Sequence, residues 1–188
     1  MIKIGITGSL ASGKTTASKI LSFKRGPLFS ADKVVKELYQ NKKFQFLVRR
    51  RFKIKKKHQI KKSLKKLILQ NKENIRKLEK IIHPSVRKKM RSFTLQNKNK
   101  KLLFYEIPLL VESKLMKYFN AIIFVKAKKQ IRLKRFQSKS GDKKLFNLLN
   151  NKQMSDQKKI KYCDYVVVNE KKLGILKKRL AAIIKKYE

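Results

Sequence analysis

An apolar stretch over residues 2–6 runs directly into a glycine-bearing turn, and this junction constrains the fold more than any other feature of the chain. The turn has a glycine, four intervening residues and then Gly-Lys-Thr, from Gly8 to Thr15. Glycines at both ends let the backbone bend tightly and aim successive N–H groups at an anion. Apolar residues then recur at helical spacing between Ala17 and Leu21. A strand, this turn and a helix, in that order, predict a loop that binds the phosphates of a nucleoside triphosphate.

The loop residues have separate expected roles. The ammonium of Lys14 reaches the terminal phosphates, and the hydroxyl of Thr15 can ligate magnesium. A glycine turn that only joins a strand to a helix is the alternative, and the apolar context on both sides favours the phosphate loop. We expect the nucleotide to be bound by Gly8, Ser9, Leu10, Ala11, Ser12, Gly13, Lys14, Thr15 and Thr16.

Further strands are predicted from short apolar runs that do not alternate with polar residues. Such runs indicate burial on both faces, which is typical of parallel strands between layers of helices. The pattern predicts an α/β doubly wound domain with an amphipathic helix near the C-terminus. The predicted strands are 2–6, 27–30, 102–105, 121–125 and 165–168, and the helix is 173–187.

The net charge is extreme, with 53 Lys and Arg against 11 Asp and Glu, or +42. Such a charge often indicates binding to nucleic acid or to an anionic membrane. Here the lysines occur in nearly every segment, and the densest run, 49–57, contains a single aromatic residue, Phe52. Because nucleic-acid sites concentrate cations and interleave aromatics, we expect no specific nucleic-acid partner, although incidental polyanion binding stays open.

Cysteine and histidine are scarce, with one Cys and two His in the 188 residues. Cys163 precedes a predicted strand, so we expect a structural thiol rather than a nucleophile, and one cysteine allows no disulfide within the chain. His58 has no supporting context, and a transition-metal site is not expected. No apolar run reaches the length of a membrane-spanning helix. We expect a cytoplasmic protein, not attached to a membrane, that is a monomer or a weak homo-oligomer.

Two segments interrupt the strand and helix alternation. Residues 35–99 show only helical periodicity, with a break at His83 because the next residue is proline. This block is a candidate acceptor-binding insertion, or else a structural helical cover, within a nucleotide-binding core of residues 1–34 and 100–188. An irregular, polar stretch over 136–152 is a candidate lid.

Acids and cations follow the predicted strands, where ligands of an open α/β sheet collect. Asp32 follows the second strand, and we expect it to act as a base or to hold magnesium, the alternative being a helix cap. Glu106 ends the third strand and is a candidate for the magnesium site, or could pair with a lysine. The cations Arg132, Arg135 and Lys139 follow the fourth strand, and could close over a polyphosphate or simply face solvent.

Several motifs, taken in order, resemble those of one enzyme family. Residues 5–15 resemble its opening phosphate loop, with Ser9 and Ala11 where glycines are usual. Residues 30–32, Ser-Ala-Asp, resemble its Asp-Ala-Asp motif and keep only the second acid. Residues 82–87 resemble its His-Pro segment. Of these three matches only the phosphate loop is specific when taken singly, and the order and spacing of the set strengthen all of them.

The most specific match is residues 106–112, an acid followed by an apolar residue, Pro-Leu-Leu, another apolar residue and Glu. Arg135, Gln153 and residues 163–169 resemble the lid region and the closing Ala-Asp-strand-Asn signature. Over almost its whole length the chain resembles the dephospho-CoA kinases, which catalyse the last step of coenzyme A synthesis. One departure is Lys139, which stands where a second lid arginine is expected.

The resemblance implies an α/β P-loop kinase, with a five-stranded parallel sheet flanked by helices, a helical acceptor-binding insertion and a lid. It implies transfer of the γ-phosphoryl group of ATP, with Mg²⁺, to the ribose 3′-hydroxyl of the small-molecule substrate dephospho-CoA, giving CoA and ADP. The residues expected to act in catalysis are Asp32, Lys14, Arg135 and Lys139. Those expected at magnesium are Thr15, Asp32 and Glu106. Those expected to contact the acceptor are Asp32, His83, Arg87 and Glu112.

Two other functions stay open at this point. Another small P-loop kinase, acting on a nucleoside, a nucleotide or a metabolite, would share the loop and the sheet. A basic nucleic-acid-binding protein with a vestigial nucleotide site would share the charge, and salt-sensitive RNA binding without turnover would distinguish it.

Overall fold

The computed structural model describes residues 1–55, 60–71 and 73–188, so His58 and the end of the basic run 49–57 lie outside the described residues. Contacts divide the chain into two units. The first contains residues 1–30 and 94–188, and the second contains residues 31–93. Each unit has apolar residues of its own at its centre.

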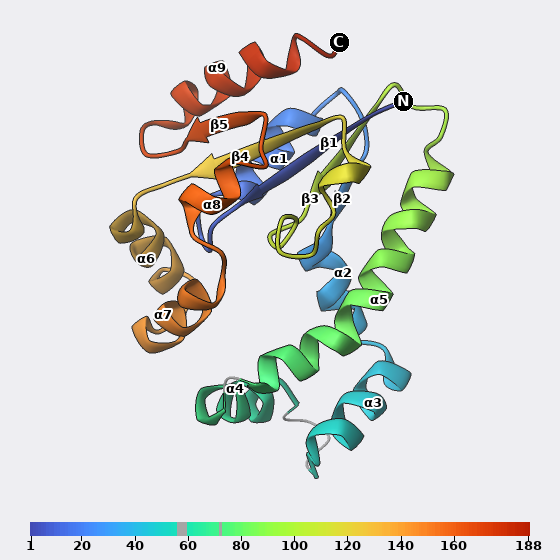
Figure 1. Ribbon diagram of the computed structural model, residues 1–188, viewed down its shortest axis with the longest axis vertical. Helices are drawn as coiled ribbons and strands as arrows, with labels where there is room; N and C mark the ends of the chain where they lie inside the picture. The colour runs from blue at the N-terminus through green and yellow to red at the C-terminus, as the bar shows by residue number, and fades with distance from the viewer. Residues whose placement is uncertain (56–59, 72) are drawn as a thin grey trace. The chain divides into compact units, whose positions relative to one another are not determined.

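The first unit is built on a five-stranded sheet with the order β2-β3-β1-β4-β5, in which every pairing is parallel (Figure 1). All five predicted strands are therefore confirmed. The parallel order brings the carboxyl ends of the strands to one edge of the sheet, as the doubly wound class requires. The strands are β1 (Ile2–Gly8), β2 (Leu28–Ser30), β3 (Leu102–Glu106), β4 (Ala121–Lys126) and β5 (Tyr165–Val168).

Helices cover both faces of this sheet, with α1 (Lys14–Ser22) behind it and the short α8 (Asp156–Ile160) in front of it in Figure 1. The C-terminal helix, α9 (Leu173–Ile184), packs beside α1 on one apolar cluster. Alternate strand residues, such as Ile4 and Ile6, point into that cluster and are fully buried. β3 and β4 are buried on both faces, which explains why these strands lack a polar face in the sequence.

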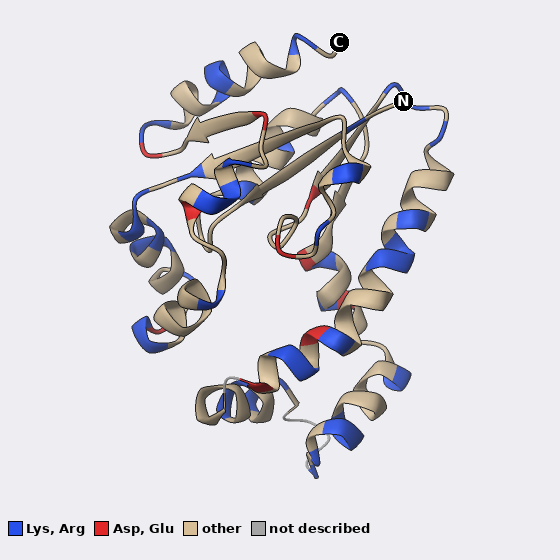
Figure 2. Cartoon of the chain, in the orientation of Figure 1, with Lys and Arg blue, Asp and Glu red and all other residues tan. Residues whose placement is uncertain are grey.

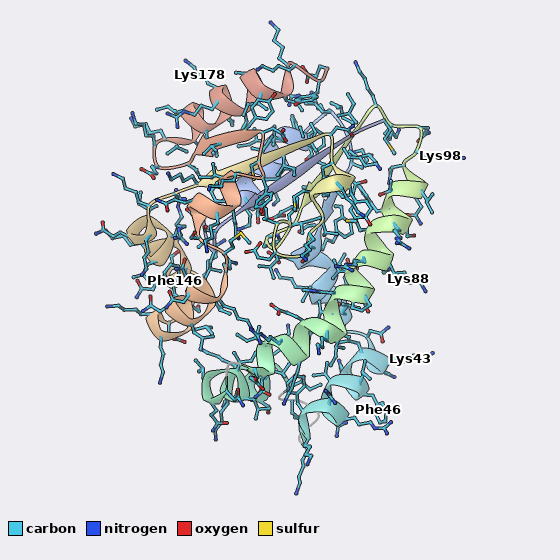
Figure 3. All side chains as sticks on the ribbon, viewed as in Figure 1. Lys43, Phe46, Lys88, Lys98, Phe146 and Lys178 are labelled. Carbon is cyan, nitrogen blue, oxygen red and sulfur yellow. The ribbon has the colours of Figure 1, made fainter. Side chains whose placement is uncertain are left out.

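The segment after β4 differs from the prediction of an irregular stretch over 136–152. Helix α6 (Lys129–Gln137) is followed by a short turn and then by α7 (Lys143–Lys152), so most of the stretch is helical. Asp142 caps α7 by accepting a hydrogen bond from the amide of Leu145 at 2.7 Å. Phe146 is buried between the two helices, with its ring 5.6 Å from that of Phe136 (Figure 3). The polar residues 138–142 made the stretch look irregular in the sequence, although Phe146 anchors it by apolar packing.

The second unit is helical, with a core of its own. Its helices are α2 (Ala31–Leu38), α3 (Lys42–Phe52), α4 (Ile60–Gln70) and α5 (Glu73–Gln96), the last of which ends in the first unit. In α3, Phe44, Val48 and Phe52 face the core while the neighbouring arginines lie outside it. The buried positions of α3 recur every four residues, in agreement with the helical periodicity expected over residues 35–99.

The predicted helix break at His83 is wrong, because α5 continues through Pro84 (Figure 1). Proline removes one backbone donor from the helix, but it does not prevent the turns on either side from forming. Buried Ile75 and Met90 anchor the helix before and after the proline. Packing on both sides therefore outweighs a local preference for ending the helix.

Charge is spread over both units, with Lys and Arg on most helices rather than in one stripe (Figure 2). Lysines such as Lys98 and Lys178 extend away from the ribbon in Figure 3. None of the helices described is long and apolar enough to cross a lipid bilayer.

Candidate active site

The loop between β1 and α1 has the backbone that its glycines allow. Gly8 has φ +147° and Gly13 has φ +96°, both in the region that disfavours side chains. A Cβ atom on Gly13 would overlap Nδ2 of Asn169, and one on Gly8 would overlap the carbonyl oxygen of Val125. Ala11 is also at positive φ, at +58°, although it carries a side chain. The two glycines are therefore required by both the bend and the packing.

Lys14 is the first residue of α1. Its side chain therefore starts at the N-terminal end of the helix, where the first backbone N–H groups also lie. The residue is 7% exposed, and its Nζ donates a hydrogen bond to the carbonyl oxygen of Ser9 at 2.8 Å. The lysine thus folds back across the loop. Positive charge from the ammonium and from the helix N-terminus together favours an anion at this position.

Thr15 and Glu106 form the polar pair beside the loop. The Thr15 hydroxyl donates to Oε1 of Glu106 at 2.5 Å, and Glu106 is 1% exposed at the end of β3. β3 is adjacent to β1 in the sheet, with Ile6 opposite Glu106, and this register places the acid beside the loop. A hydroxyl and a carboxylate are hard oxygen ligands of the kind that Mg²⁺ takes together with phosphates and water. The pair therefore fits a magnesium ion.

A metal site made entirely of protein side chains would need more ligands than this pair. In the part of the chain that the structure describes, no three His, Cys, Asp or Glu residues gather as a metal site. Magnesium in phosphoryl-transfer sites needs only one or two protein oxygens, because substrate phosphates and water supply the others. The small donor set is thus consistent with a magnesium ion that arrives with a nucleotide.

Side chains from beyond β4 donate hydrogen bonds to carbonyl groups of the loop. Arg135 donates to the carbonyl oxygens of Ser12 at 3.2 Å and of Asn169 at 3.0 Å. The Asn169 side-chain amide also donates to the Ser12 carbonyl, at 2.9 Å. Arg135, expected from the sequence, therefore lies at the loop in this structure.

Arg132 contacts the loop one turn earlier. It is buried, and it donates to the carbonyl oxygens of Ala127 at 3.1 Å and Leu10 at 3.3 Å and to the side chain of Asn150 at 2.6 Å. Burial lowers the pKa of Arg132, and the negative charge of Asp156 opposes that shift. An arginine remains charged under these conditions, so Arg132 fixes α6, α7 and the loop together.

The connection between α7 and α8 supplies two more contacts. The Gln153 side-chain oxygen accepts a hydrogen bond from the Leu10 amide at 3.1 Å, and the Asp156 carboxylate accepts one from the Ser9 hydroxyl. Gln153 is part of the family resemblance in the sequence, whereas Asp156 is not. Nothing local marks this acid, because its partner lies 147 positions away in the sequence.

Glu112 lies in the same unit, after β3, and its Oε1 is 2.7 Å from the ammonium of Lys159. The same oxygen accepts a hydrogen bond from the Met154 amide at 3.2 Å. Lys159 is 0% exposed, so Glu112 compensates a buried charge and holds α8 against the turn that follows β3. Lys159 could not be told apart from the other lysines in the sequence.

The remaining predicted residues lie on elements other than the loop. Lys139 follows α6 and is exposed. Among the residues described, its ammonium has no hydrogen-bond or ion-pair partner. Asp32, in the first turn of α2, and His83 and Arg87, on α5, belong to the second unit. His83 and Arg87 are four residues apart and share one side of their helix.

Cys163 is consistent with a structural thiol. Its S–H donates to the carbonyl oxygen of Lys159 at 3.3 Å. Burial, with a further contribution from the neighbouring Asp164 carboxylate, raises the pKa of Cys163 to about 12. The thiolate population at neutral pH is therefore very small.

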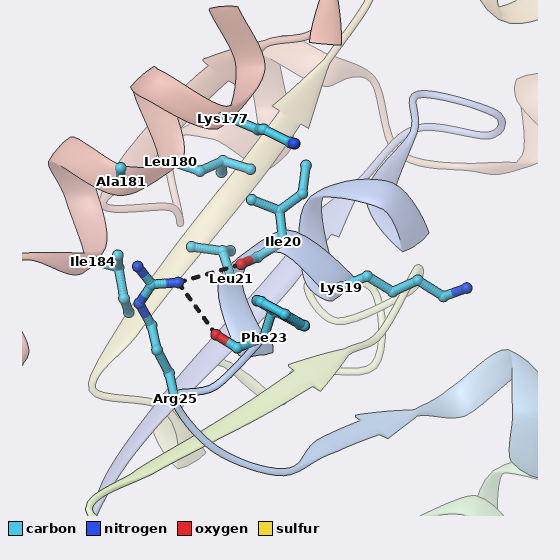
Figure 4. Close-up of a pocket in the computed structure, with 9 residues that line it drawn as sticks. All are labelled: Lys19, Ile20, Leu21, Phe23, Arg25, Lys177, Leu180, Ala181 and Ile184. Carbon is cyan, nitrogen blue, oxygen red and sulfur yellow. Dashed lines mark hydrogen bonds between the residues drawn. The ribbon is translucent and has the colours of Figure 1, made fainter. Parts of the chain in front are cut away.

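A separate concavity of about 490 Å³ lies between α1 and α9 (Figure 4). Apolar side chains such as Ile20, Leu180 and Ile184 line it, and Lys19, Arg25 and Lys177 flank them. It contains none of the predicted site residues, and apolar walls do not suit a polyphosphate. This groove is thus distinct from the loop site.

Comparisons with known proteins agree along nearly the whole chain. The dephospho-CoA kinase family model matches residues 2–174. A dephospho-CoA kinase from Rickettsia conorii is 34% identical over 189 residues, which cover 100% of this chain and 98% of the relative. A crystal structure of a Thermus thermophilus protein has a TM-score of 0.80 at 27% identity, covering 100% of this chain and 98% of that one. A dephospho-CoA kinase from Campylobacter jejuni has a TM-score of 0.66 at 26% identity, covering 98% and 96%.

These matches include the phosphate loop, the segment after β3 and the α6–α8 region in a single alignment of full length. The fold class predicted from the sequence, a P-loop kinase with a five-stranded parallel sheet, is confirmed as well. This chain belongs to the dephospho-CoA kinase family.

Proposed function

We propose that this protein transfers the γ-phosphoryl group of ATP to the ribose 3′-hydroxyl of dephospho-CoA, giving CoA and ADP. The observation that carries the proposal is the pairing of Thr15 with Glu106 beside the loop and Lys14, in a member of this family. Phosphoryl transfer requires positioning and charge stabilisation above all, and this arrangement supplies both.

The loop and α1 bind the phosphates. Amides from Gly8 to Thr16 turn toward the anion, and Lys14 exchanges its contact with the Ser9 carbonyl for phosphate oxygens. Thr15 and Glu106 would hold Mg²⁺, with Asp32 as a further outer-shell candidate, and the ion when bound neutralises charge on the phosphates. Arg135, already at the loop, adds positive charge close to the transferring group.

Asp32 accepts the proton of the attacking 3′-hydroxyl. Its support is its position two residues after Ser30, which pairs in register with Glu106 at the same edge of the sheet. As the ribose oxygen bonds to the γ-phosphorus, the bond to the β–γ bridging oxygen breaks and ADP leaves. The hydroxyl proton passes to the Asp32 carboxylate and from there to solvent.

The acceptor is bound by the helical insertion, predicted as 35–99, for which His83 and Arg87 supply polar groups on one side of α5. Glu112, held in place by its contact with Lys159, is a further candidate contact for the acceptor. The α6–α7 segment, 136–152, closes as a lid and brings Lys139 toward the phosphates. These roles follow from the family resemblance and from the charge that each group carries.

Family membership favours this reaction over the other two functions considered above. A kinase for another small acceptor would share the loop, whereas the resemblance implies that the segment 106–112 is specific to this family. The even spread of cations in Figure 2 does not favour a nucleic-acid site. We further propose a cytoplasmic protein that is monomeric or weakly self-associating.

A direct assay tests the proposal. ATP and dephospho-CoA are incubated with the enzyme, and the product is identified by mass and by the position of its phosphate. Lys14→Ala should lower CoA formation by about a hundredfold, because it removes a charge that stabilises the transferring group. Lys19→Ala, on the same helix but outside the loop, is the matched control. Phosphorylation of a different acceptor in preference to dephospho-CoA, or a normal rate with Lys14→Ala, would contradict the proposal.

A further inference from the structure

Asp156 is an acid from far along the sequence that contacts the first half of the phosphate loop. Asp156 opens α8, and its Oδ1 accepts a hydrogen bond from the hydroxyl of Ser9. Ser9 is 3% exposed, so water competes little for that hydroxyl. A buried hydrogen bond to a carboxylate is stronger than one between neutral groups. Asp156 thus restrains the residue that immediately follows β1.

The same carboxylate supports a second contact. It offsets the cost of burying Arg132, whose guanidinium holds the carbonyl oxygen of Leu10. Gln153, three residues before Asp156, holds the amide of Leu10 from the same connection. Ser9 and Leu10 are therefore restrained by one short segment of chain, from Gln153 to the first residue of α8. The second half of the loop is restrained separately, by Arg135 and Asn169.

We propose that Asp156 is a positioning residue that holds the first half of the phosphate loop in its ATP-binding shape through the Ser9 hydroxyl. This inference rests on the proposed function. A glycine at position 9, as the resemblance leads one to expect, would offer Asp156 no hydroxyl. Ser9 and Asp156 therefore act as a pair in this chain. A glycine at position 9 would leave the backbone free to move, whereas the serine fixes it through the hydrogen bond to Asp156.

Two effects of Asp156 on ATP oppose each other. Its negative charge repels the polyphosphate, whereas its hydrogen bond keeps the loop amides in place. The Ser9 hydroxyl donates to the carboxylate and the positive charge of Arg132 acts on it, so much of its charge is offset. We therefore expect positioning to dominate. Asp156→Asn separates the two effects, because the amide oxygen can still accept from Ser9 while the charge is gone.

The test is a double-mutant cycle with Ser9→Ala, Asp156→Ala and the double variant. Each single change should raise the KM for ATP and the dissociation constant of ADP about tenfold, with kcat within about twofold, as loss of a charge-assisted hydrogen bond predicts. The double variant should be no worse than either single variant, because the pair acts as one interaction. Asp156→Asn should keep ADP affinity within about threefold of the wild type.

Glu188→Gln is the charge-matched control, since Glu188 pairs with Arg25 and not with the loop. Thermal unfolding of every variant is recorded, so that ADP affinity is compared only among folded proteins. Additive effects of Ser9→Ala and Asp156→Ala, or unchanged ADP affinity in both, would overturn the inference. The ADP titration needs no acceptor, so a wild type that binds ADP but makes no CoA would contradict the proposed function while leaving this test intact.

Discussion

The phosphate loop and the helical unit of residues 31–93 are stabilised in different ways. Polar side chains from far along the sequence, such as Arg132 and Asn169, hold the loop by its carbonyl groups. Apolar residues close together in the sequence, such as Phe44, Val48 and Phe52, hold the helical unit. The shape of the loop therefore depends on directional hydrogen bonds, whereas the core of the helical unit depends on non-directional apolar burial.

Asp32 gives the largest expected effect, and it tests whether the helical unit carries chemistry as well as structure. Asp32→Asn should lower kcat by a factor of about 10² to 10⁴, because the amide cannot accept the hydroxyl proton. ADP affinity should change little. Rates of CoA formation and ADP titrations measure the two quantities. Glu37→Gln, exposed on the same helix, is the control, and an unchanged kcat for Asp32→Asn would remove this residue from the mechanism.

Gly13→Ala tests the directional contacts of the loop. The new methyl group would overlap the Asn169 side chain at a backbone φ of +96°, so we expect the loop to shift and CoA formation to fall by about a hundredfold. Gly174→Ala is the matched control, since nothing lies within 4 Å of the position that its methyl group would take. Equal activity of the two variants would show that the loop tolerates displacement.

Val48→Ala tests burial in the helical unit. Val48 is 0% exposed, and its truncation should lower the free energy of unfolding by about 1–3 kcal/mol. ADP affinity should remain that of the wild type. Phe46→Ala removes a larger side chain that is 64% exposed, and should be nearly neutral in the same denaturant titration. A loss of ADP affinity with Val48→Ala would break the separation drawn between the two units.

Cys163 has the smallest expected consequence for catalysis, because its thiol belongs to none of the roles proposed above. With its pKa raised to about 12, alkylation by iodoacetamide at pH 8 should be about a thousandfold slower in the folded protein than in the unfolded one. The raised pKa stabilises the folded state fully below the unfolded thiol pKa of about 8.5, and this contribution declines as pH rises toward 12. Rapid alkylation without unfolding would show that the thiol is accessible and ionised.

Much of the fold and part of the site could be predicted from the sequence. Glycines that must adopt positive φ stand out by residue type, and acids at strand ends such as Glu106 stand out against apolar runs. The continuity of α5 through Pro84 could not be predicted, because packing on both sides decides it. Nor could the contact of Asp156 with Ser9, because neither residue is unusual in its own neighbourhood.

The sequence by itself determined the five strands, the bend of the phosphate loop and the apolar faces of most helices, since backbone sterics and burial leave their mark on consecutive residues. Only the tertiary structure decided which of the 53 lysines and arginines serve the loop. Arg132 reaches Leu10 across 122 positions, and Arg135 reaches Ser12 across 123. Those contacts exist because the strand order places β4 beside β1, so that the helix after β4 lies next to the loop after β1. In a uniformly basic sequence, nothing near Arg132 or Arg135 indicates that these two arginines reach the loop.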